Sequence, residues 1–311
     1  MKNIPPQQLH TSTASSLPTG SDDSLHIPVL LTDVVDLLDP QSGERYLDLT
    51  AGYGGHASRI IDRVGAEHAT LVDRDERAIA HLTEYAQQGA RIMHSDFATA
   101  ARHLVEEAEQ FDMVLVDLGV SSPQLDMAER GFSIKRDGPL DMRMDESSTR
   151  TAADIINRSS EKDLARIIAD YGQESRAKAA RIAHTIRLNR PLFTTSELAA
   201  VVLKTHRGGW QKIHPATRTF QAIRIALNDE LVQIETLMPL LPRLLKKNGR
   251  VAIISFHSLE DKIVKSYFAE QAAAGYEAEM KLLTKKPILG AEHDTTNPRA
   301  RSAILRAAVK T

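Results

Sequence analysis

Four aspartates follow apolar runs at regular intervals in the first half of the chain. Each stands at the end of a segment with the composition of a buried strand: Asp48, Asp73, Asp96 and Asp117. Carboxylates grouped in this way can accept hydrogen bonds from ribose hydroxyls or from an amine, and they can face a positively charged sulfonium. A single aspartate is more often a helix cap or a solvated loop residue. Their recurrence at successive strand ends favours one shared ligand site.

A glycine-rich turn follows the first of these strands. Residues Asp48 to His56 read Asp-Leu-Thr-Ala-Gly-Tyr-Gly-Gly-His and separate a short strand pattern from a helical pattern. Gly52 and Gly54 let the backbone bend and approach a ligand closely, because glycine has no Cβ. A strand, a glycine turn and a helix in this order are typical of a nucleotide site, in which Asp73 would accept hydrogen bonds from the ribose.

Two cofactors fit this turn. The pattern G-x-G-x-x-A would indicate a nicotinamide-dependent oxidoreductase. S-adenosylmethionine has no pyrophosphate, and it needs glycines beside its methionine part, an acid for its ribose and a patch for its adenine. Asp96 and Phe97 follow the third strand and could supply an acceptor for the adenine amino group and an apolar ring. With Asp117 facing the sulfonium, these features favour S-adenosylmethionine.

The residues after Asp117 indicate a methyl acceptor. Leu118 to Gln124 lies where amino-directed methyltransferases carry a short polar loop with proline, although only Ser122-Pro123 matches that pattern. An exocyclic amine on a base is a poor nucleophile, so an enzyme must accept its hydrogen bonds and align it with the methyl group. Asp117, with Ser121 and Ser122, could position such an amine. Three aromatic residues could stack on a base drawn out of its helix: Phe132, Trp210 and Phe220.

Alternating strands and helices must position these groups. The alternation predicts an open, mostly parallel sheet with helices on both faces and a ligand at the carboxyl ends of the strands. The expected elements are helix 27–38, strand 46–49, helix 57–64, strand 69–72, helix 76–87, strand 90–94, helix 98–109, strand 111–118, helix 219–245, strand 250–256, helix 259–271 and strands 279–284 and 303–309.

The alternation stops after Asp117 for about a hundred residues, far more than a strand–helix connection needs. Helical patterns occupy this interval, at 152–157, 161–171, 175–188 and 196–205. We therefore expect residues 123–215 to form an inserted helical domain, and residues 24–122 and 216–311 to form the main domain. Residues 1–23 are rich in Ser, Thr, Pro and Gln, which predicts a disordered tail.

Positive charge is concentrated in one part of an almost neutral chain. The 311 residues include 39 Lys and Arg against 41 Asp and Glu, a formal net charge of -2. The segment from Arg176 to Arg224 has ten Lys and Arg and one acid, Glu197. This favours an anionic partner such as RNA, while a solvated helix face explains it equally well. The lack of Cys excludes disulfides and fits a reducing cytosol, and no apolar run predicts a secretory signal or a membrane span.

Six segments are similar to those of a known family. They are residues 48–56, 117–124, 129–133 together with 137–145, 214–221, 255–261 and 297–302. On these segments, and over about residues 26–307, the chain resembles the bacterial ribosomal RNA small subunit methyltransferase H family. The resemblance implies an α/β, class I S-adenosylmethionine-dependent methyltransferase, Rossmann-like, with an inserted all-helical domain. The implied reaction is methylation of the N4 amine of a decoding-centre cytosine in 16S rRNA, in the cytoplasm and with the small ribosomal subunit as partner.

The resemblance also implies which individual residues form the site. Beside Asp48 and Gly52 from the turn, the implied cofactor contacts are Gly54, Gly55, His56, Asp73, Phe97, Asp117 and Gln124. The expected substrate contacts are His214, Thr217, Arg218, Phe220, Ser255 and His257. For residues 214–221 the alternative is a helix start capped by Thr217 or Thr219. Asp96 could contact adenine or cap the next helix.

The sequence leaves a few alternatives open. His257 with Glu260 and Asp261 has the residue types of a metal site, but neighbouring acids on a helix point apart, so we expect no metal. A nicotinamide-dependent oxidoreductase and a non-catalytic RNA-binding or assembly factor are the rival functions. The sequence decides neither the oligomeric state, for which a homodimer is one option, nor the group that takes the proton from the amine.

Overall fold

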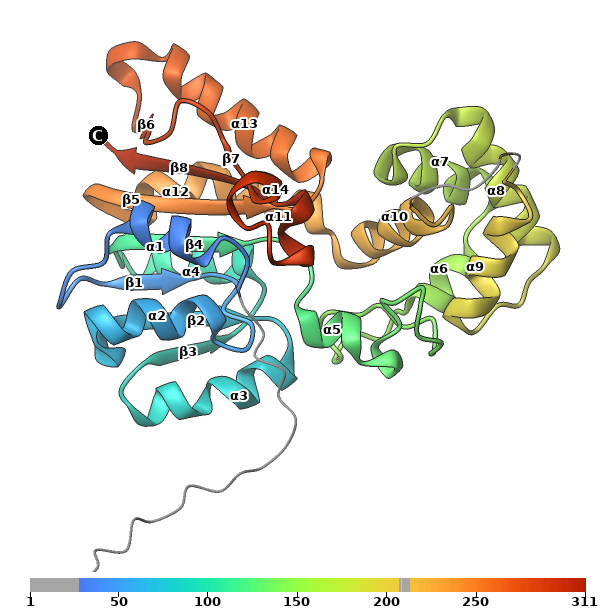
Figure 1. Ribbon diagram of the computed structural model, residues 1–311, viewed down its shortest axis with the longest axis horizontal. Coiled ribbons are helices and arrows are strands. Elements are labelled where there is room, and N and C mark those ends of the chain that lie inside the picture. The colour runs from blue at the N-terminus through green and yellow to red at the C-terminus, as the bar shows by residue number, and fades with distance from the viewer. Residues whose placement is uncertain (1–27, 207, 209–212) are drawn as a thin grey trace, which may run out of the picture.

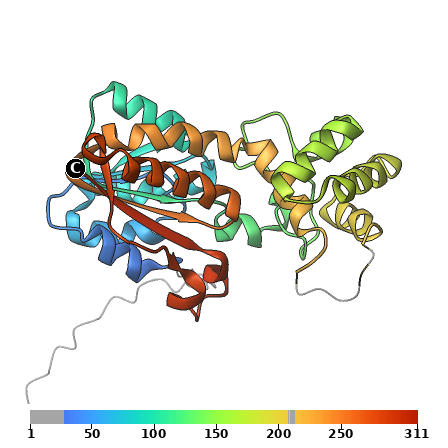
Figure 2. The same ribbon diagram turned by 90° about the horizontal axis from the view of Figure 1, so that it is seen from above.

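The computed structural model describes residues 28–206, 208 and 213–311. The predictions for the tail and for Arg207, Trp210 and Lys212 lie outside these residues. Figure 1 shows two lobes: an α/β lobe that holds both ends of the described chain, and a helical lobe beside it. The chain enters the helical lobe after α5 (Ser122–Asp126) and returns through α10 (Thr217–Asn228). Figure 2 shows the same separation from above.

The α/β lobe is built on one sheet with the order β3-β2-β1-β4-β5-β8-β6. Its parallel strands are β1 (Tyr46–Asp48), β2 (Ala69–Asp73), β3 (Arg91–His94), β4 (Phe111–Asp117) and β5 (Leu245–Ser255). The antiparallel strands are β8 (Ile304–Lys310), which pairs with β5, and β6 (Met280–Leu282) and β7 (Ile288–Leu289), which pair with β8. The strand order reverses between β1 and β4, so a ligand crevice is expected at the carboxyl ends of these strands.

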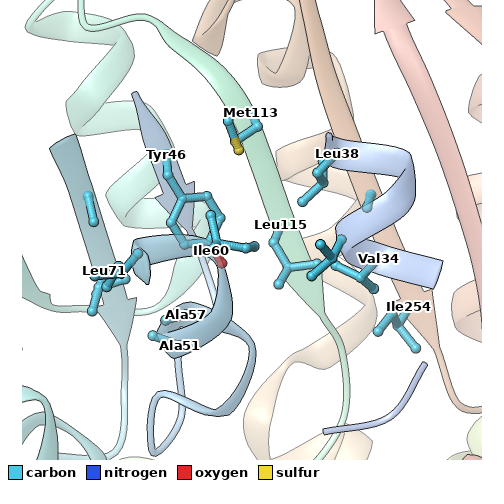
Figure 3. Packing of buried hydrophobic residues seen from close by; sticks show 14 of the residues in the cluster. Val34, Leu38, Tyr46, Ala51, Ala57, Ile60, Leu71, Met113, Leu115 and Ile254 are labelled. Carbon is cyan, nitrogen blue, oxygen red and sulfur yellow. The ribbon is translucent and has the colours of Figure 1, made fainter. Parts of the chain in front are cut away.

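Helices cover both faces of the sheet, as predicted. One face packs against α1 (Leu31–Leu38), α2 (Gly55–Val64) and α3 (Glu76–Gln87). The other face packs against α4 (Phe97–Glu106), α11 (Glu230–Leu237), α12 (Leu241–Leu244) and α13 (Ser258–Ala273). Figure 3 shows the first layer, where Val34 and Leu38 of α1 lie beside Leu115 and Ile254 of the sheet. This packing fixes α2, and with it the glycine turn, against β1 and β2.

The helical lobe has its own apolar core. It comprises α6 (Ala152–Arg158), α7 (Glu161–Gly172), α8 (Arg176–Leu188) and α9 (Thr195–Leu203). Buried residues of this core run from Phe132 to Ile223, so the first turns of α10 pack with the insertion although they lie beyond residue 215. The exact limits of the two domains stay a prediction.

The predicted helix 219–245 is wrong as a single element. The chain turns at Asp229, whose φ of 52° is left-handed and ends α10. Pro239 and Pro242 then lack the N–H groups that a continuous helix needs, and a 3-10 turn at Met238–Leu240 separates α11 from α12. The predicted helix 27–38 begins only at Leu31, because Leu30 is also left-handed. The remaining predicted elements recur with ends shifted by a few residues.

Short elements complete the described chain. These are α14 (Gly290–His293) and the 3-10 helices Ala66–His68, Ala128–Arg130, Gly275–Glu277 and Pro298–Ser302. Within the described ranges, no helix combines the length and the apolar character required to cross a membrane.

Candidate active site

The glycine turn leads directly into α2. Gly54 is the residue before the helix, with a left-handed φ of 82°. A Cβ there would lie 2.7 Å from the ring of Tyr85, and a Cβ on Gly55 would lie 2.7 Å from Pro28, so larger residues would displace these neighbours. The first N–H groups of a helix have no partner within it, and they favour an anionic group. The turn therefore offers a close approach to the start of α2.

Two acids hold this turn from different sides. Asp73 Oδ2 accepts the Gly52 N–H at 2.7 Å, and its Oδ1 accepts the Asp75 N–H at 2.8 Å. Asp48 is 1% exposed; it accepts the Tyr46 hydroxyl at 2.6 Å and the Thr50 N–H at 3.1 Å. Burial raises the pKa of Asp73 and brings the pKa of Asp48 to about 7. Asp48 thus has donors for both oxygens inside the turn, and its contact with a cofactor stays a prediction.

Asp117 ends β4 beside the ring of His56. Its Oδ2 lies 3.6 Å from His56 Nδ1, while its Oδ1 is buried and has no hydrogen-bond partner among the described residues. The Asp117 N–H donates to Thr50 Oγ1 at 2.6 Å, which ties the end of β4 to the glycine turn. Burial, and then the nearby acids Asp48 and Glu260, raise the pKa of Asp117 well above its usual range. The structure thereby brings Asp117 and His56 together at the strand-order reversal.

The loop after Asp117 is held by a capping box at the start of α5. Ser121 Oγ accepts the Gln124 N–H at 3.4 Å, and Gln124 Oε1 accepts the Ser121 N–H at 3.0 Å. The Gln124 side-chain nitrogen donates to Asp75 at 2.9 Å, so both ends of this amide have protein partners. Ser122 is 6% exposed. Ser121 and Gln124 therefore fix the loop, and their direct contact with a ligand stays a prediction.

The side chain of Asp96 caps the helix that follows β3. Asp96 Oδ1 accepts the Thr99 N–H at 2.9 Å, so this side chain caps α4. Phe97 is the first residue of α4 and is partly exposed at the carboxyl end of β3. Capping accounts for the position of Asp96, and Phe97 keeps a surface that a ligand could contact.

The residues predicted to bind substrate fall into two groups. His214 and Arg218 are exposed at the start of α10, and Thr217 is partly exposed. The residue before α10 is Ala216, and no side chain caps the helix, so neither Thr217 nor Thr219 does so. Phe220 is 5% exposed and packs in the helical core, as does Phe132 at 7%. Both rings are buried, and the Arg130 guanidinium lies over the Phe132 ring, 5.9 Å from its centroid, so neither ring offers a free face for stacking on a base.

The last predicted substrate residues lie where β5 meets α13. Ser255 is 1% exposed at the end of β5. His257 caps α13 by accepting the Glu260 N–H at Nδ1, 3.3 Å away, and its Nε2 lies 3.2 Å from Glu260 Oε1. Burial and the Arg224 guanidinium lower the pKa of His257 to about 3, whereas burial raises the pKa of Glu260 to about 7. His257 is thus a neutral acceptor beside a buried acid.

His257 and Glu260 form a cluster with Glu230, and Arg224 supplies positive charge to it. Glu230, His257 and Glu260 have ligand atoms within 4.8 Å of one another, a spacing that could hold a metal ion. Arg224, however, donates from Nε and Nη2 to the two oxygens of Glu230, at 2.8 Å each. Asp261 turns the other way and accepts from Arg306 at 2.7 Å, so the predicted divergence of the adjacent acids is confirmed.

The basic segment is partly neutralised by acids outside it. Five of its cations have such partners: Arg176 with Asp170 at 3.0 Å, Lys178 with Glu174 at 2.7 Å, Arg187 with Glu161 at 2.5 Å, Arg218 with Glu174 at 3.7 Å and Arg224 with Glu230 at 2.8 Å. Counting charges along the sequence therefore overstates the net positive charge of this surface.

One buried pair was missed by the sequence analysis. Arg130 Nη1 donates to Asp75 Oδ2 at 2.6 Å, and Asp75 also caps α3 by accepting the Arg77 N–H. The only sequence signal for Arg130 is its place in segment 129–133, which carries part of the family resemblance but has no assigned role. The pair ties the loop after α5 to the end of β2.

Comparisons with known proteins agree on one family. The family model of the MraW methylase family matches residues 23–311. A ribosomal RNA small subunit methyltransferase H from Synechocystis sp. is 47% identical over 304 residues, which cover 94% of this chain and 95% of that protein. The protein of the same name from Stenotrophomonas maltophilia is 44% identical over 315 residues, covering 96% and 97%.

Among solved structures, the chain is similar to a putative methyltransferase from Streptococcus mutans in complex with SAH. The TM-score is 0.41 at 11% identity, covering 92% of this chain and 100% of that chain. The family match over nearly the whole chain confirms the predicted family and the predicted methyltransferase fold. With relatives above 40% identity over more than nine-tenths of its length, the chain belongs to the MraW methylase family.

Proposed function

We propose that the protein transfers a methyl group from S-adenosylmethionine to the exocyclic N4 amine of a cytosine in the RNA of the small ribosomal subunit. One observation carries this proposal. Asp117 stands at the carboxyl end of β4, where the strand order reverses, and its side chain is 26% exposed, so a ligand can reach its carboxyl group. A carboxyl oxygen at this position can accept a hydrogen bond from an amine of the substrate.

The cofactor is S-adenosylmethionine, and the residues at the turn fit it. The backbone N–H groups of Gly55 and His56, at the start of α2, would receive its carboxylate. Each oxygen of Asp73 accepts one N–H and keeps a second lone pair, which suits the two hydroxyls of a ribose. Phe97 would cover the adenine. When bound, the cofactor supplies an electrophilic methyl group.

The methyl acceptor follows from the chemistry of Asp117. In its pairing pattern cytosine presents N4 as a hydrogen-bond donor, and carboxylates accept from that amine. Accepting a hydrogen bond from N4 raises the electron density on this nitrogen and holds the amine in line with the methyl group. The relatives named above are methyltransferases of small-subunit ribosomal RNA, which supports this RNA as the substrate class. Such a substrate would place the protein in the cytoplasm with the ribosome.

The start of α10 would contact the RNA. His214 and Arg218 are exposed there, and the Gln173 side-chain oxygen in the helical lobe accepts from Ser258 of α13 at 2.9 Å. This contact holds the insertion beside the end of β5, at the same edge of the sheet as Asp117, because β4 and β5 are parallel. His257 and Ser255 would then border the base rather than the phosphates, because both are largely buried.

The deciding experiment is methyl transfer with a labelled cofactor. Small subunits that lack the modification, partial particles and naked 16S rRNA serve as acceptors, and nucleoside analysis identifies the product. We expect label in N4-methylcytidine, and a loss of about 100-fold for Asp117→Asn. Asp112→Asn, at the opposite end of the same strand, is the matched control. Label in another nucleoside would overturn the cytosine assignment, and no label would favour an RNA-binding factor without catalysis.

A thermal-shift comparison separates the oxidoreductase alternative. S-adenosylmethionine should raise the melting temperature of the protein, because a ligand that binds only the folded state stabilises it. NAD should leave the melting temperature unchanged. Stabilisation by NAD alone would contradict the proposed cofactor.

A further inference from the structure

The motif at residues 297–302 carries part of the family resemblance but has no role in the function proposed above. The strand that follows it, β8, is antiparallel to β5, with Ile304 opposite Ser255. Ser255 ends β5, and Asp117 ends the neighbouring parallel strand β4. The motif therefore lies at the same edge of the sheet as Asp117, where a substrate of the protein would have to approach.

The motif forms a turn that is anchored at its centre. Asn297 Oδ1 accepts the Arg299 N–H at 3.1 Å and caps the 3-10 turn that follows. Ala300 is fully buried, and it packs so closely on α14 that a Cβ on Gly290 would lie 2.0 Å from the Ala300 carbonyl oxygen. The residues on either side of this alanine, Arg299 and Arg301, are both exposed. The turn thus presents two arginines to solvent from a fixed backbone.

Arg299 shares an acid with an arginine of the inserted segment. Arg299 Nη2 donates to Asp126 Oδ2 at 2.6 Å, and Arg136 Nη2 lies 3.8 Å from Asp126 Oδ1. Arg136 Nη1 also donates to the carbonyl oxygen of Asp126. Asp126 ends α5, the short helix that begins five residues after Asp117, and Figure 1 shows α14 and the turn after it close to α5. Segments far apart in the sequence therefore meet beside the loop that follows Asp117.

Positive charge is in excess at this place. We call Arg136, Arg299 and Arg301 the rim arginines; they are three cations beside one acid, Asp126. The side chains of Arg136 and Arg299 are 58% and 38% exposed. The Arg301 side chain makes no hydrogen bond or ion pair with any residue that the structure describes. Ion pairs between exposed side chains contribute little to stability, so holding Asp126 does not account for three arginines.

The chemistry of the rim arginines fits a phosphate. A guanidinium carries five N–H donors in a planar fork that matches the oxygens of a phosphate, and Arg299 uses only Nη2 on Asp126. RNA whose base reaches Asp117 continues on both sides of that base. It must therefore pass over the α/β lobe, which carries Asp117 and the rim arginines, as well as over the start of α10 in the helical lobe.

We propose that the rim arginines bind phosphates of the RNA next to the target nucleotide and form a second RNA surface, on the α/β lobe. This inference rests on the proposed function and adds a role for the motif at residues 297–302. Phosphate contacts fix the position of an RNA without reading its sequence. The surface thus holds the RNA in place while the residues around Asp117 act on the base.

The test measures the affinity for a labelled, unmodified 16S rRNA transcript at several salt concentrations. The variant combines Arg136→Gln, Arg299→Gln and Arg301→Gln. Its affinity should be about tenfold lower or more, and the slope of log affinity against log salt should fall by about 2, since each phosphate contact to a single strand contributes about 0.7. The KM for RNA should rise by the same factor, while kcat and the affinity for S-adenosylmethionine stay unchanged.

A matched control removes the same charge elsewhere. Arg63→Gln, Arg91→Gln and Arg243→Gln change three exposed arginines in the last turn of α2 and beside the first residues of β3 and β5, at the opposite edge of the sheet. This combination should leave the affinity and the salt slope unchanged. An equal loss in both triple variants would indicate an effect of net charge and would overturn the proposal.

A second control separates RNA binding from a structural role of the ion pairs. Asp126→Asn removes the carboxylate that Arg136 and Arg299 share and keeps all the rim arginines. The affinity for RNA should stay the same or increase, because the surface becomes more positive. A loss as large as that of the Gln triple variant would mean that the arginines act by holding α5, and it would contradict RNA binding.

The remaining outcomes are also decisive. A loss with whole small subunits but not with the naked transcript would assign the surface to a ribosomal protein and overturn the proposal. If the Gln triple variant does not fold, Arg301→Glu, which breaks no side-chain contact, should lower the salt slope on its own, and an unchanged slope would contradict the proposal. If the wild-type protein methylates no RNA, the proposed function fails, while the dependence of binding on the rim arginines still decides the surface.

Discussion

Arg130 and Asp75 form a buried ion pair that joins the inserted segment to the cofactor side of the sheet. The distance from Arg130 Nη1 to Asp75 Oδ2 is 2.6 Å, and the side chains are 4% and 2% exposed. The Asp75 N–H donates to Asp73, the expected ribose acceptor. Arg130 Nη2 also donates to the carbonyl oxygen of Arg143 at 3.0 Å. One arginine thus orients the end of β2 and the loop that leads into the helical lobe.

Removing this arginine should strongly destabilise the protein. Arg130→Met leaves the carboxylate of Asp75 buried without a cation, a situation that costs about 3 to 5 kcal/mol. The free energy of unfolding can be measured in urea. Arg136→Met, at an exposed arginine of the same segment, should change it by less than about 0.5 kcal/mol. Equal effects of the two substitutions would show that the buried pair has no special contribution.

The affinity for S-adenosylmethionine should depend on Asp73. Asp73→Ala removes the acceptor for the ribose and also the acceptor for two backbone N–H groups of the turn. Calorimetry should show affinity reduced about 10- to 100-fold or more, since hydrogen bonds to a charged group contribute about 1.5 to 3 kcal/mol each. Glu76→Ala, at an exposed acid three residues further on, should leave the affinity unchanged. Normal binding by Asp73→Ala would remove Asp73 from the site.

Much of the main domain could be predicted because its signals are local. Apolar runs of strand length alternate with helical patterns. The turn needs glycine at position 54, because the φ of Gly54 is left-handed and a Cβ there would collide with the Tyr85 ring. The helix over Glu76–Gln87 was predicted to the residue. Patterns of this kind depend on residues that are close in sequence, so they can be recognised without knowledge of the tertiary structure.

The less predictable features depend on contacts between distant residues. Asp75 and Arg130 are 55 positions apart, and nothing in their local sequence indicates that they pair. Phe220 lies in a segment with the charge of an RNA-binding surface, yet its ring faces inward because α10 packs on α7. Charge counting likewise could not find acids such as Glu161, which pairs with Arg187 from outside the basic segment.

The stability of the protein should depend on pH through Glu260. Its folded pKa of about 7 lies above its ordinary value of 4.5, so between these pH values the folded state binds more protons than the unfolded chain. Stability contributed by this group is therefore present below about pH 4.5 and is lost as the pH rises to about 7. Glu260→Gln removes the dependence and keeps an acceptor for the Phe256 and His257 N–H groups.

The measurement compares this variant with the wild type at several pH values. Between about pH 4.5 and pH 8, the unfolding free energy of Glu260→Gln should rise relative to the wild type by about 3 kcal/mol. His257, whose pKa is lowered to about 3, has the opposite pH dependence, but it is present in both proteins and cancels in the difference. Glu270→Gln on the exposed face of α13 should give a constant difference. A constant difference for Glu260→Gln would contradict the raised pKa.

Charge reversal at Arg218 should weaken the RNA interaction and spare the cofactor. The Arg218 side chain is 59% exposed and pairs loosely with Glu174, at 3.7 Å. If Arg218 contacts a phosphate, Arg218→Glu should raise the KM for RNA about tenfold. It should also reduce the slope of log affinity against log salt by about 0.7 to 1, because one fewer counterion is released. Calorimetry should give an unchanged affinity for S-adenosylmethionine.

Arg91→Glu provides the matched control for Arg218→Glu. Arg91 is 41% exposed and pairs with Glu107 at 2.9 Å on the edge strand β3, away from the helical lobe. Arg91→Glu also reverses the charge of an exposed arginine that pairs with a glutamate. Because Arg91 lies away from the start of α10, this substitution should leave both the KM for RNA and the salt slope unchanged. An equal effect of the two reversals would indicate net charge rather than a contact at α10. Loss of cofactor binding with Arg218→Glu would instead mean that the start of α10 supports the fold of the site.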